Sequence, residues 1–181
     1  DMKMLQFTVR GIALDQTSRL PLVLLHNRER NILLPLPIGP FEASAIIVEM
    51  EWVQPPRPLT HDLLAQMFIK HSFKLISAEI YACLDDKQLA RIKYRSKFTS
   101  HTMEVRPSDG IALAIRLESP ILLSEDVAHS LSEGHELFMM MIFPSQRFCT
   151  WSRINLRLLL CSYLCSYTRN DPSLTCWTEN H

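Results

Sequence analysis

The spacing of apolar residues changes period along the chain, and this change constrains the fold most strongly. The stretches with strand-like spacing and β-branched residues are 4–14, 20–25, 32–38, 73–84, 88–95, 99–105 and 120–123. The stretches with apolar residues three and four positions apart, as in a helix, are 41–52, 59–72 and 107–117, with a shorter one at 125–131. Strands in runs, with helices between the runs, favour the α+β class with a mixed or antiparallel sheet and three main helices.

Prolines and one glycine limit how the first half of the chain is arranged. Pro35 and Pro37 remove two backbone donors from the third strand, which predicts an edge strand or a strand end. Pro40 suits the first position of the first helix, and Gly39 before it is expected to provide a turn at positive φ. The buried stripe of the second helix is expected to consist of Leu63, Leu64, Met67 and Phe68.

Composition predicts one globular domain with an appendage. The chain has 181 residues, of which 47% are apolar and 21% charged, which is enough for one domain with a core. We assign residues 1–138 to this domain. From residue 139 the chain contains arginines, aromatics and cysteines but almost no acidic residues, so 139–181 is expected to be a separate, poorly ordered extension without an assigned function.

Net charge and apolar runs exclude several classes of protein. The formal net charge is zero, which excludes a strongly basic nucleic-acid coat and requires any phosphate-binding surface to be local. The four glycines do not form a glycine-rich phosphate loop. No apolar run reaches the roughly 18 residues of a membrane span, and the N-terminus lacks a secretory signal core. We therefore expect a cytoplasmic protein without a membrane partner.

Two distant segments share one pattern of residues. Residues 57–62 are Arg-Pro-Leu-Thr-His-Asp, residues 106–109 are Arg-Pro-Ser-Asp, and an apolar helix follows each segment. Prolines and hydroxyl residues suit helix starts, and an aspartate in the first turn faces the positive end of the helix dipole. One interpretation is therefore structural: two capped helices, with the arginines as ion-pair partners.

The same residue types also suit phosphodiester hydrolysis. That reaction requires neutralised phosphoryl oxygens, an activated water and usually a divalent ion. Arginine binds phosphate through two parallel hydrogen bonds, and helix N-termini donate to anions. The candidate phosphate-binding residues are Arg57, Arg106, Thr60 and Ser108.

Titratable residues of the two segments are candidates for the chemistry itself. His61, Asp62 and Asp109 are the candidate catalytic residues, with His61 as general base or acid because imidazole titrates near neutrality. Glu42, Asp62 and Asp109 are candidate ligands of Mg²⁺ or Mn²⁺, which prefer carboxylate oxygens. In each case the alternative is a first-turn carboxylate that stabilises its own helix.

A run of basic residues surrounds the hairpin predicted over residues 73–95. These residues are Lys70, Lys74, Lys87, Arg91, Lys93, Arg95 and Lys97. Tyr94 and Phe98 lie among them, which is the composition of a nucleic-acid-binding face. A solvated strand face has the same composition, so both interpretations stay open.

The motifs, taken together, resemble the bifunctional nuclease family. The resemblance lies in residues 37–43, 57–64 and 105–114, in their order and separation, and covers about residues 3–137. It implies an α+β domain that self-associates and has DNase and RNase activity, with nucleic acid as its partner. Gly110 stands where alanine is usual in this family, which loosens the helix start by up to about 1 kcal/mol. The stretch after residue 139 does not resemble the family's usual ending.

The sequence therefore predicts a homo-oligomeric nuclease assisted by a divalent metal. Two alternatives stay open: a non-catalytic oligomeric or regulatory domain, and a binding module for a small phosphorylated ligand. The catalytic hypothesis requires that residues 57–62 and 106–109 fold against each other.

Overall fold

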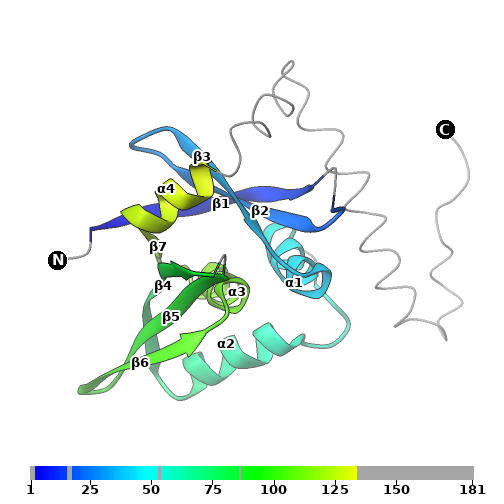
Figure 1. Ribbon diagram of the computed structural model, residues 1–181. Coiled ribbons are helices and arrows are strands. Elements are labelled where there is room, and N and C mark those ends of the chain that lie inside the picture. Colours follow the sequence, from blue (N-terminus) through cyan, green and yellow to red (C-terminus); the bar gives the residue numbers. More distant parts are fainter. Residues whose placement is uncertain (1–2, 16–17, 53, 86, 134–181) are drawn as a thin grey trace, which may run out of the picture. The chain divides into compact units, whose positions relative to one another are not determined.

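The computed structural model describes residues 3–15, 18–52, 54–85 and 87–133, which form a seven-stranded mixed sheet and four helices (Figure 1). The strands are β1 (Met4–Leu14), β2 (Pro21–Asn27), β3 (Ile32–Pro37), β4 (Phe73–Leu84), β5 (Lys87–Ser96), β6 (Thr99–Val105) and β7 (Ile121–Ser124). The helices are α1 (Pro40–Met50), α2 (Thr60–Lys70), α3 (Pro107–Arg116) and α4 (Glu125–Glu133). The predicted α+β class is confirmed. The predicted boundary near residue 138 and the extension 139–181 lie outside the described residues.

The sheet has the strand order β3-β2-β1-β7-β4-β5-β6. All neighbouring strands are antiparallel except β4 and β7, which are parallel. The long strand β1 joins two parts of the sheet, because Met4–Phe7 pairs with β7 and Thr8–Leu14 pairs with β2. The strand that contains Pro35 and Pro37 lies at the edge, as their missing N–H donors predict.

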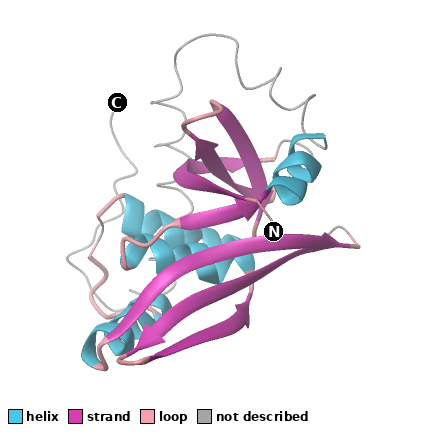
Figure 2. Cartoon of the chain, turned by 90° about the vertical axis from the view of Figure 1, so that its left-hand side faces the viewer, coloured by secondary structure: helices cyan, strands magenta, loops and turns pink. Residues whose placement is uncertain are grey.

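Helices α1, α2 and α3 gather on one side of the long strands β4, β5 and β6 (Figure 2). Helix α4 lies apart from them, against β3, β4 and β7. Helix α3 is central, since it contacts α1, α2, β4 and β5. Its residues Ile111–Ala114 are at most 1% exposed, so the middle turn of this helix is buried on all sides and anchors the helix in the core. No helix of the described ranges has both the length and the apolar character needed to cross a membrane.

The predicted buried stripe of α2 is wrong for three of its four residues. The exposed members are Leu63, Leu64 and Met67. Helix α2 instead buries Ala65 and Phe68. The first turn of α2 carries His61 and Asp62, whose side chains form hydrogen bonds with side chains of α3. Those polar contacts set the rotation of the helix, and the leucines consequently face outward.

Candidate active site

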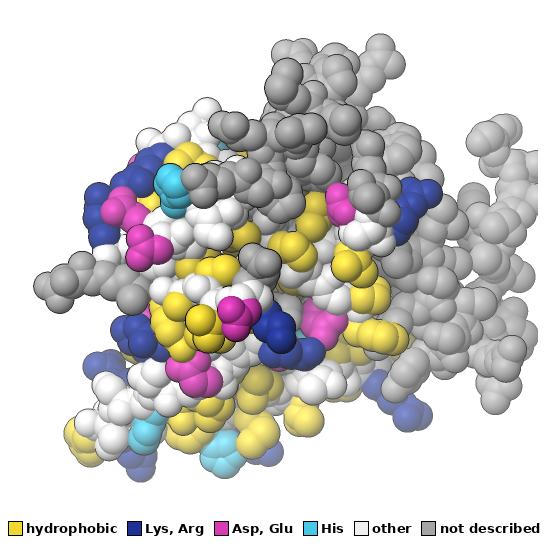
Figure 3. All heavy atoms as spheres, in the orientation of Figure 1, with side chains coloured by type: hydrophobic (Ala, Val, Ile, Leu, Met, Phe, Trp, Pro, Cys, Tyr) yellow, Lys and Arg dark blue, Asp and Glu magenta, His cyan; other side chains and the backbone are white. Residues whose placement is uncertain are grey.

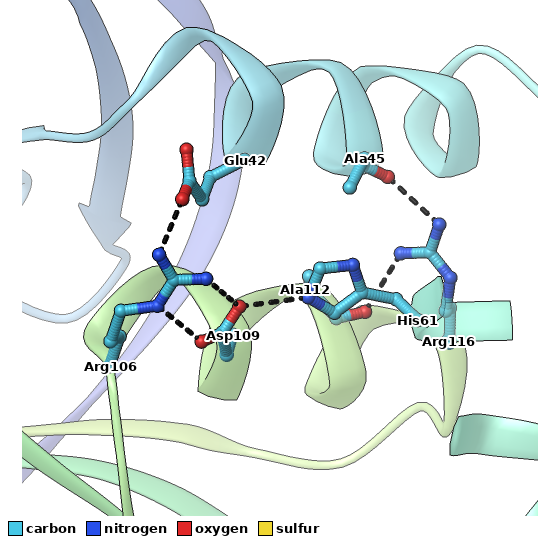
Figure 4. A network of polar contacts seen from close by, with 7 residues as sticks. All are labelled: Glu42, Ala45, His61, Arg106, Asp109, Ala112 and Arg116. Atoms are coloured by element: carbon cyan, nitrogen blue, oxygen red, sulfur yellow. Dashed lines mark hydrogen bonds and ion pairs between the residues drawn. The ribbon is translucent and has the colours of Figure 1, made fainter. Parts of the chain in front are cut away.

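The first turns of α1, α2 and α3 contribute to one polar cluster (Figure 4). Glu42 lies in the first turn of α1, His61 in that of α2 and Asp109 in that of α3, while Arg106 is the N-cap residue of α3. These four residues are called the Arg106 cluster below. The structure therefore brings the two similar segments together, as the catalytic hypothesis requires.

Arg106 connects the two carboxylates of this cluster. Its Nε and Nη2 donate to the Asp109 carboxylate at 2.6 and 3.0 Å, and its Nη1 donates to Glu42 Oε1 at 2.6 Å. On the other side, His61 Nε2 lies 3.0 Å from Asp109 Oδ1. A guanidinium has five N–H donors, so these three bonds leave one N–H on each terminal nitrogen for another acceptor. The Arg106 side chain is 64% exposed, which makes those donors accessible to an anion.

The electrostatic environment keeps Asp109 ionised. Burial by itself raises the pKa of this carboxyl, but hydrogen bonds from Arg106 and His61, together with the charge of Arg106, lower it below its usual value. The hydrogen bond to Asp109 and the negative charge of that carboxylate raise the pKa of Arg106. With a neutral imidazole, the cluster therefore carries a formal charge of −1.

Gly39 makes room for Glu42, and the predicted reason for this glycine is wrong. Its φ is −75°, in the extended region that every residue adopts, so no turn at positive φ is present. A Cβ at this position would lie 2.1 Å from Glu42 Oε2. The missing side chain lets the Glu42 carboxylate fold back over the start of its own helix, from where it reaches Arg106.

Asp62 belongs to a different group of contacts. Its Oδ2 accepts the N–H of Leu59 at 2.8 Å, which caps α2, and its Oδ1 accepts Nε of Arg116 at 2.7 Å. The Arg116 side chain is 3% exposed and also donates to the carbonyls of Ala112 and Ala45, at 3.0 and 2.9 Å (Figure 4). Sequence reasoning missed Arg116, because a basic residue in the last turn of a helix is typical of a solvent-exposed end.

The three predicted metal ligands do not face one point. Glu42 and Asp109 bind Arg106, whereas Asp62 binds Arg116. In the part of the chain that the structure describes, no three His, Cys, Asp or Glu side chains form a group suited to a metal ion. As arranged, these carboxylates fit guanidinium groups better than a shared dication. An ion between Glu42 and Asp109 requires Arg106 to move away, and the metal stays a prediction.

The remaining phosphate-binding candidates lie at the same helix starts with different exposure. Thr60 is exposed at the first residue of α2, whereas Ser108 is buried in the first turn of α3. Arg57 is exposed in the loop before α2 and has no hydrogen bond or ion pair among the described residues. Of these candidates, Arg57 and Thr60 are open to a ligand.

Comparison with known proteins identifies the family. The bifunctional nuclease domain matches residues 23–135, a range that contains every residue of the Arg106 cluster. Two uncharacterized proteins of Mycobacterium tuberculosis, MT1877 and Rv1829, are each 34% identical to this chain over 119 residues. The alignment covers 66% of this chain and 71% of each relative. The chain therefore belongs to the bifunctional nuclease domain family.

Proposed function

We propose that the protein hydrolyses phosphodiester bonds of DNA or RNA at the Arg106 cluster. The observation that carries this proposal is the 3.0 Å contact between His61 and Asp109 across two separate segments. An ionised carboxylate only accepts hydrogen bonds, so the Nε2 of His61 carries the hydrogen and the Nδ1 has a free lone pair. A carboxylate that orients an imidazole in this way is a recurring arrangement for general base catalysis. Membership of the family supports nucleic acid as the polymer.

Each residue has a defined role in this proposal. His61 Nδ1 accepts a proton from the attacking water, whose oxygen forms a bond to phosphorus. The bond from phosphorus to the leaving sugar oxygen breaks, and that oxygen takes a proton from solvent. Arg106 offers its two remaining N–H groups to the phosphoryl oxygens, which reduces the negative charge that opposes attack.

The charge of the cluster requires a further cation. Glu42, Asp109 and Arg106 sum to −1, and a phosphodiester adds another negative charge. Arg57 is exposed in the loop that leads into α2, the helix that carries His61, and is the proposed source of this positive charge. The Mg²⁺ or Mn²⁺ predicted from the sequence would supply more charge neutralisation when bound.

A second candidate is a non-catalytic, homo-oligomeric or regulatory domain of the cytoplasm. The observation in its favour is that arginines already bind each of the three carboxylates, so that the network ties α1, α2 and α3 together. In this case the Arg106 cluster stabilises the fold and the purified protein cleaves nothing.

Cleavage of labelled single-stranded and duplex DNA and RNA by the purified chain distinguishes the two candidates. We expect His61→Gln and Asp109→Asn each to lower the cleavage rate by about a hundredfold to ten-thousandfold, as for loss of a general base. His26→Gln is the matched control, because His26 lies on β2, outside the Arg106 cluster, and its ring contacts Asn31 at 3.4 Å. All three variants are purified identically, so a contaminating nuclease would give equal activity in all of them. Full activity of both site variants would overturn the proposed roles.

A further inference from the structure

One end of the sheet formed by β4, β5 and β6 combines positive charge with aromatic rings. The segments 67–75 and 93–101, which meet there, contain no aspartate or glutamate. We define the basic end by Lys70, Lys74, Arg95, Lys97 and Phe98. It comprises the end of α2, the start of β4 and the hairpin between β5 and β6 (Figure 1). Lys, Arg and His side chains gather over this region at the lower left of Figure 3.

Two cations of the basic end lie directly opposite each other. Lys74 and Arg95 are paired across the antiparallel strands β4 and β5, an arrangement that is unfavourable for like charges. Farther along the same face, Arg91 and Lys93 share the buried Glu79 at 2.8 and 2.9 Å. Among the described residues, no carboxylate pairs with Lys70, Lys74, Arg95 or Lys97. An external anion would relieve this repulsion.

One aromatic ring is fully exposed beside these charges. Phe98 is 100% exposed in the turn between β5 and β6, next to Lys97. Three further rings lie on the opposite face of these strands from Lys74 and Arg95: Tyr94 stacks on His101 at 5.1 Å, and Phe73 lies 5.8 Å from Tyr94. Phe73 and Tyr94 also contact Phe68 of α2, so Phe98 is the ring of the basic end that is fully open to a base. An exposed aromatic ring next to cations suits a single strand, whose unpaired bases are free to stack on the ring. The bases of a duplex already stack on each other. These features favour a single strand over a duplex.

Helix α2 connects the basic end to the Arg106 cluster. His61 lies in its first turn and Lys70 is its last residue, nine positions later. At the rise of an α-helix this separation is about 14 Å along the axis. Folds that bind single strands cover about 4–16 nucleotides, so one strand is long enough to contact both places.

We infer that the basic end binds single-stranded nucleic acid and holds the strand that is cleaved at the Arg106 cluster. The second half of this inference rests on the proposed function, whereas binding itself does not require cleavage. Four phosphate contacts predict that the logarithm of the binding constant falls with the logarithm of salt concentration with a slope of about −3.

Fluorescence anisotropy of a labelled oligothymidine of about 12 nucleotides with the full chain tests this inference. We expect the double variant Lys74→Glu/Arg95→Glu to bind at least about tenfold more weakly at about 50 mM salt. The matched control is Arg10→Glu/Arg28→Glu, which changes net charge equally at exposed positions of β1 and the turn after β2, and should bind within about twofold of the unchanged protein. Phe98→Ala should weaken the binding of oligothymidine by about fivefold or more, whereas Phe98→Trp should bind as tightly as the unchanged protein.

Three results would overturn the inference: an equal loss in both double variants, tighter binding of a duplex than of the single strand, or binding only to vesicles that contain phosphatidylglycerol. Failure of the proposed function is distinguishable, since it appears as absent cleavage while oligothymidine binding stays sensitive to Lys74 and Arg95.

Discussion

His61 and Asp109 are in contact at 3.0 Å although 48 residues separate them along the chain. The contact joins the first turn of α2 to the first turn of α3, and Arg106 extends it to Glu42 on α1. Because the middle turn of α3 is buried on all sides, the core holds the helix whose N-terminus carries these side chains. The Arg106 cluster therefore depends on how the three helices pack. Several substitutions separate what this cluster contributes to stability from what it contributes to activity.

Gly39→Ala should impair the site without unfolding the protein. The φ of −75° suits alanine, so the free energy of unfolding should change by less than about 1 kcal/mol. The new Cβ would meet Glu42 Oε2, however, and the carboxylate must swing away and release Arg106. We expect cleavage to fall by about tenfold, the equivalent of one charge-assisted hydrogen bond. Thermal unfolding and steady-state kinetics measure the two effects.

Gly110→Ala is the matched control for that substitution. A Cβ at Gly110 would meet the side chains of Val105 and Ala78 at 3.4 and 3.5 Å, which is ordinary van der Waals contact. Since alanine favours a helix over glycine, we expect this variant to be more stable by about 0.5–1 kcal/mol with unchanged cleavage. A loss of stability would show that the space beside Val105 is smaller than the structure indicates.

Arg116→Ala should destabilise the protein far more than Arg106→Ala. The Arg116 side chain is 3% exposed, and its removal takes one hydrogen bond each from Asp62 Oδ1 and from the carbonyls of Ala45 and Ala112. We expect a loss of about 2–4 kcal/mol. Arg106 is 64% exposed, so solvent screening limits its effect on stability to less than about 1 kcal/mol, with cleavage strongly reduced. Urea unfolding of both variants tests this order, and equal losses of stability would contradict it.

Glu79 should make the fold sensitive to acid. Burial raises the pKa of this carboxyl, but hydrogen bonds from Lys93, Arg91 and Ser77 outweigh burial and lower it. Its folded pKa is thus below the unfolded value of about 4.3, so its contribution is fully present above that pH and is lost as pH falls through the folded pKa. Glu79→Gln should cost about 1–3 kcal/mol at neutral pH and should flatten the fall of the unfolding temperature below about pH 4. Glu29→Gln, at an exposed position, should change neither the stability at neutral pH nor the fall of the unfolding temperature in acid.

Chelation tests the predicted divalent metal. Cleavage should fall after dialysis against a chelator and recover with Mg²⁺ or Mn²⁺, and Mn²⁺ binding should weaken in Asp109→Asn. Arg106 already donates hydrogen bonds to both Glu42 and Asp109. The metal ion should therefore bind weakly in the absence of nucleic acid. Equal cleavage rates in chelator and in Mg²⁺ would contradict the prediction, whereas the His61 variants would still test the general base.

Local patterns were sufficient for most of the secondary structure. Strand alternation and helical spacing depend on residues within a few positions of one another, so the eleven elements in the described ranges match the predicted stretches closely. Pro35 and Pro37 likewise predicted an edge strand, since a missing N–H donor acts wherever the strand lies. The two similar segments were recognised as helix starts for the same local reason.

Only the tertiary structure decided which of these helix starts meet and what each carboxylate binds. Asp62 pairs with Arg116 and Asp109 with Arg106, although each aspartate is the third residue of its helix. The packing of α2 also determined that Leu63 faces solvent, and the position of the Glu42 carboxylate over the start of α1 determined that Gly39 is needed for space at a negative φ. Local sequence sets the φ and ψ preferences of a residue, whereas the partner of a charged side chain depends on distances between elements that only the packed core fixes.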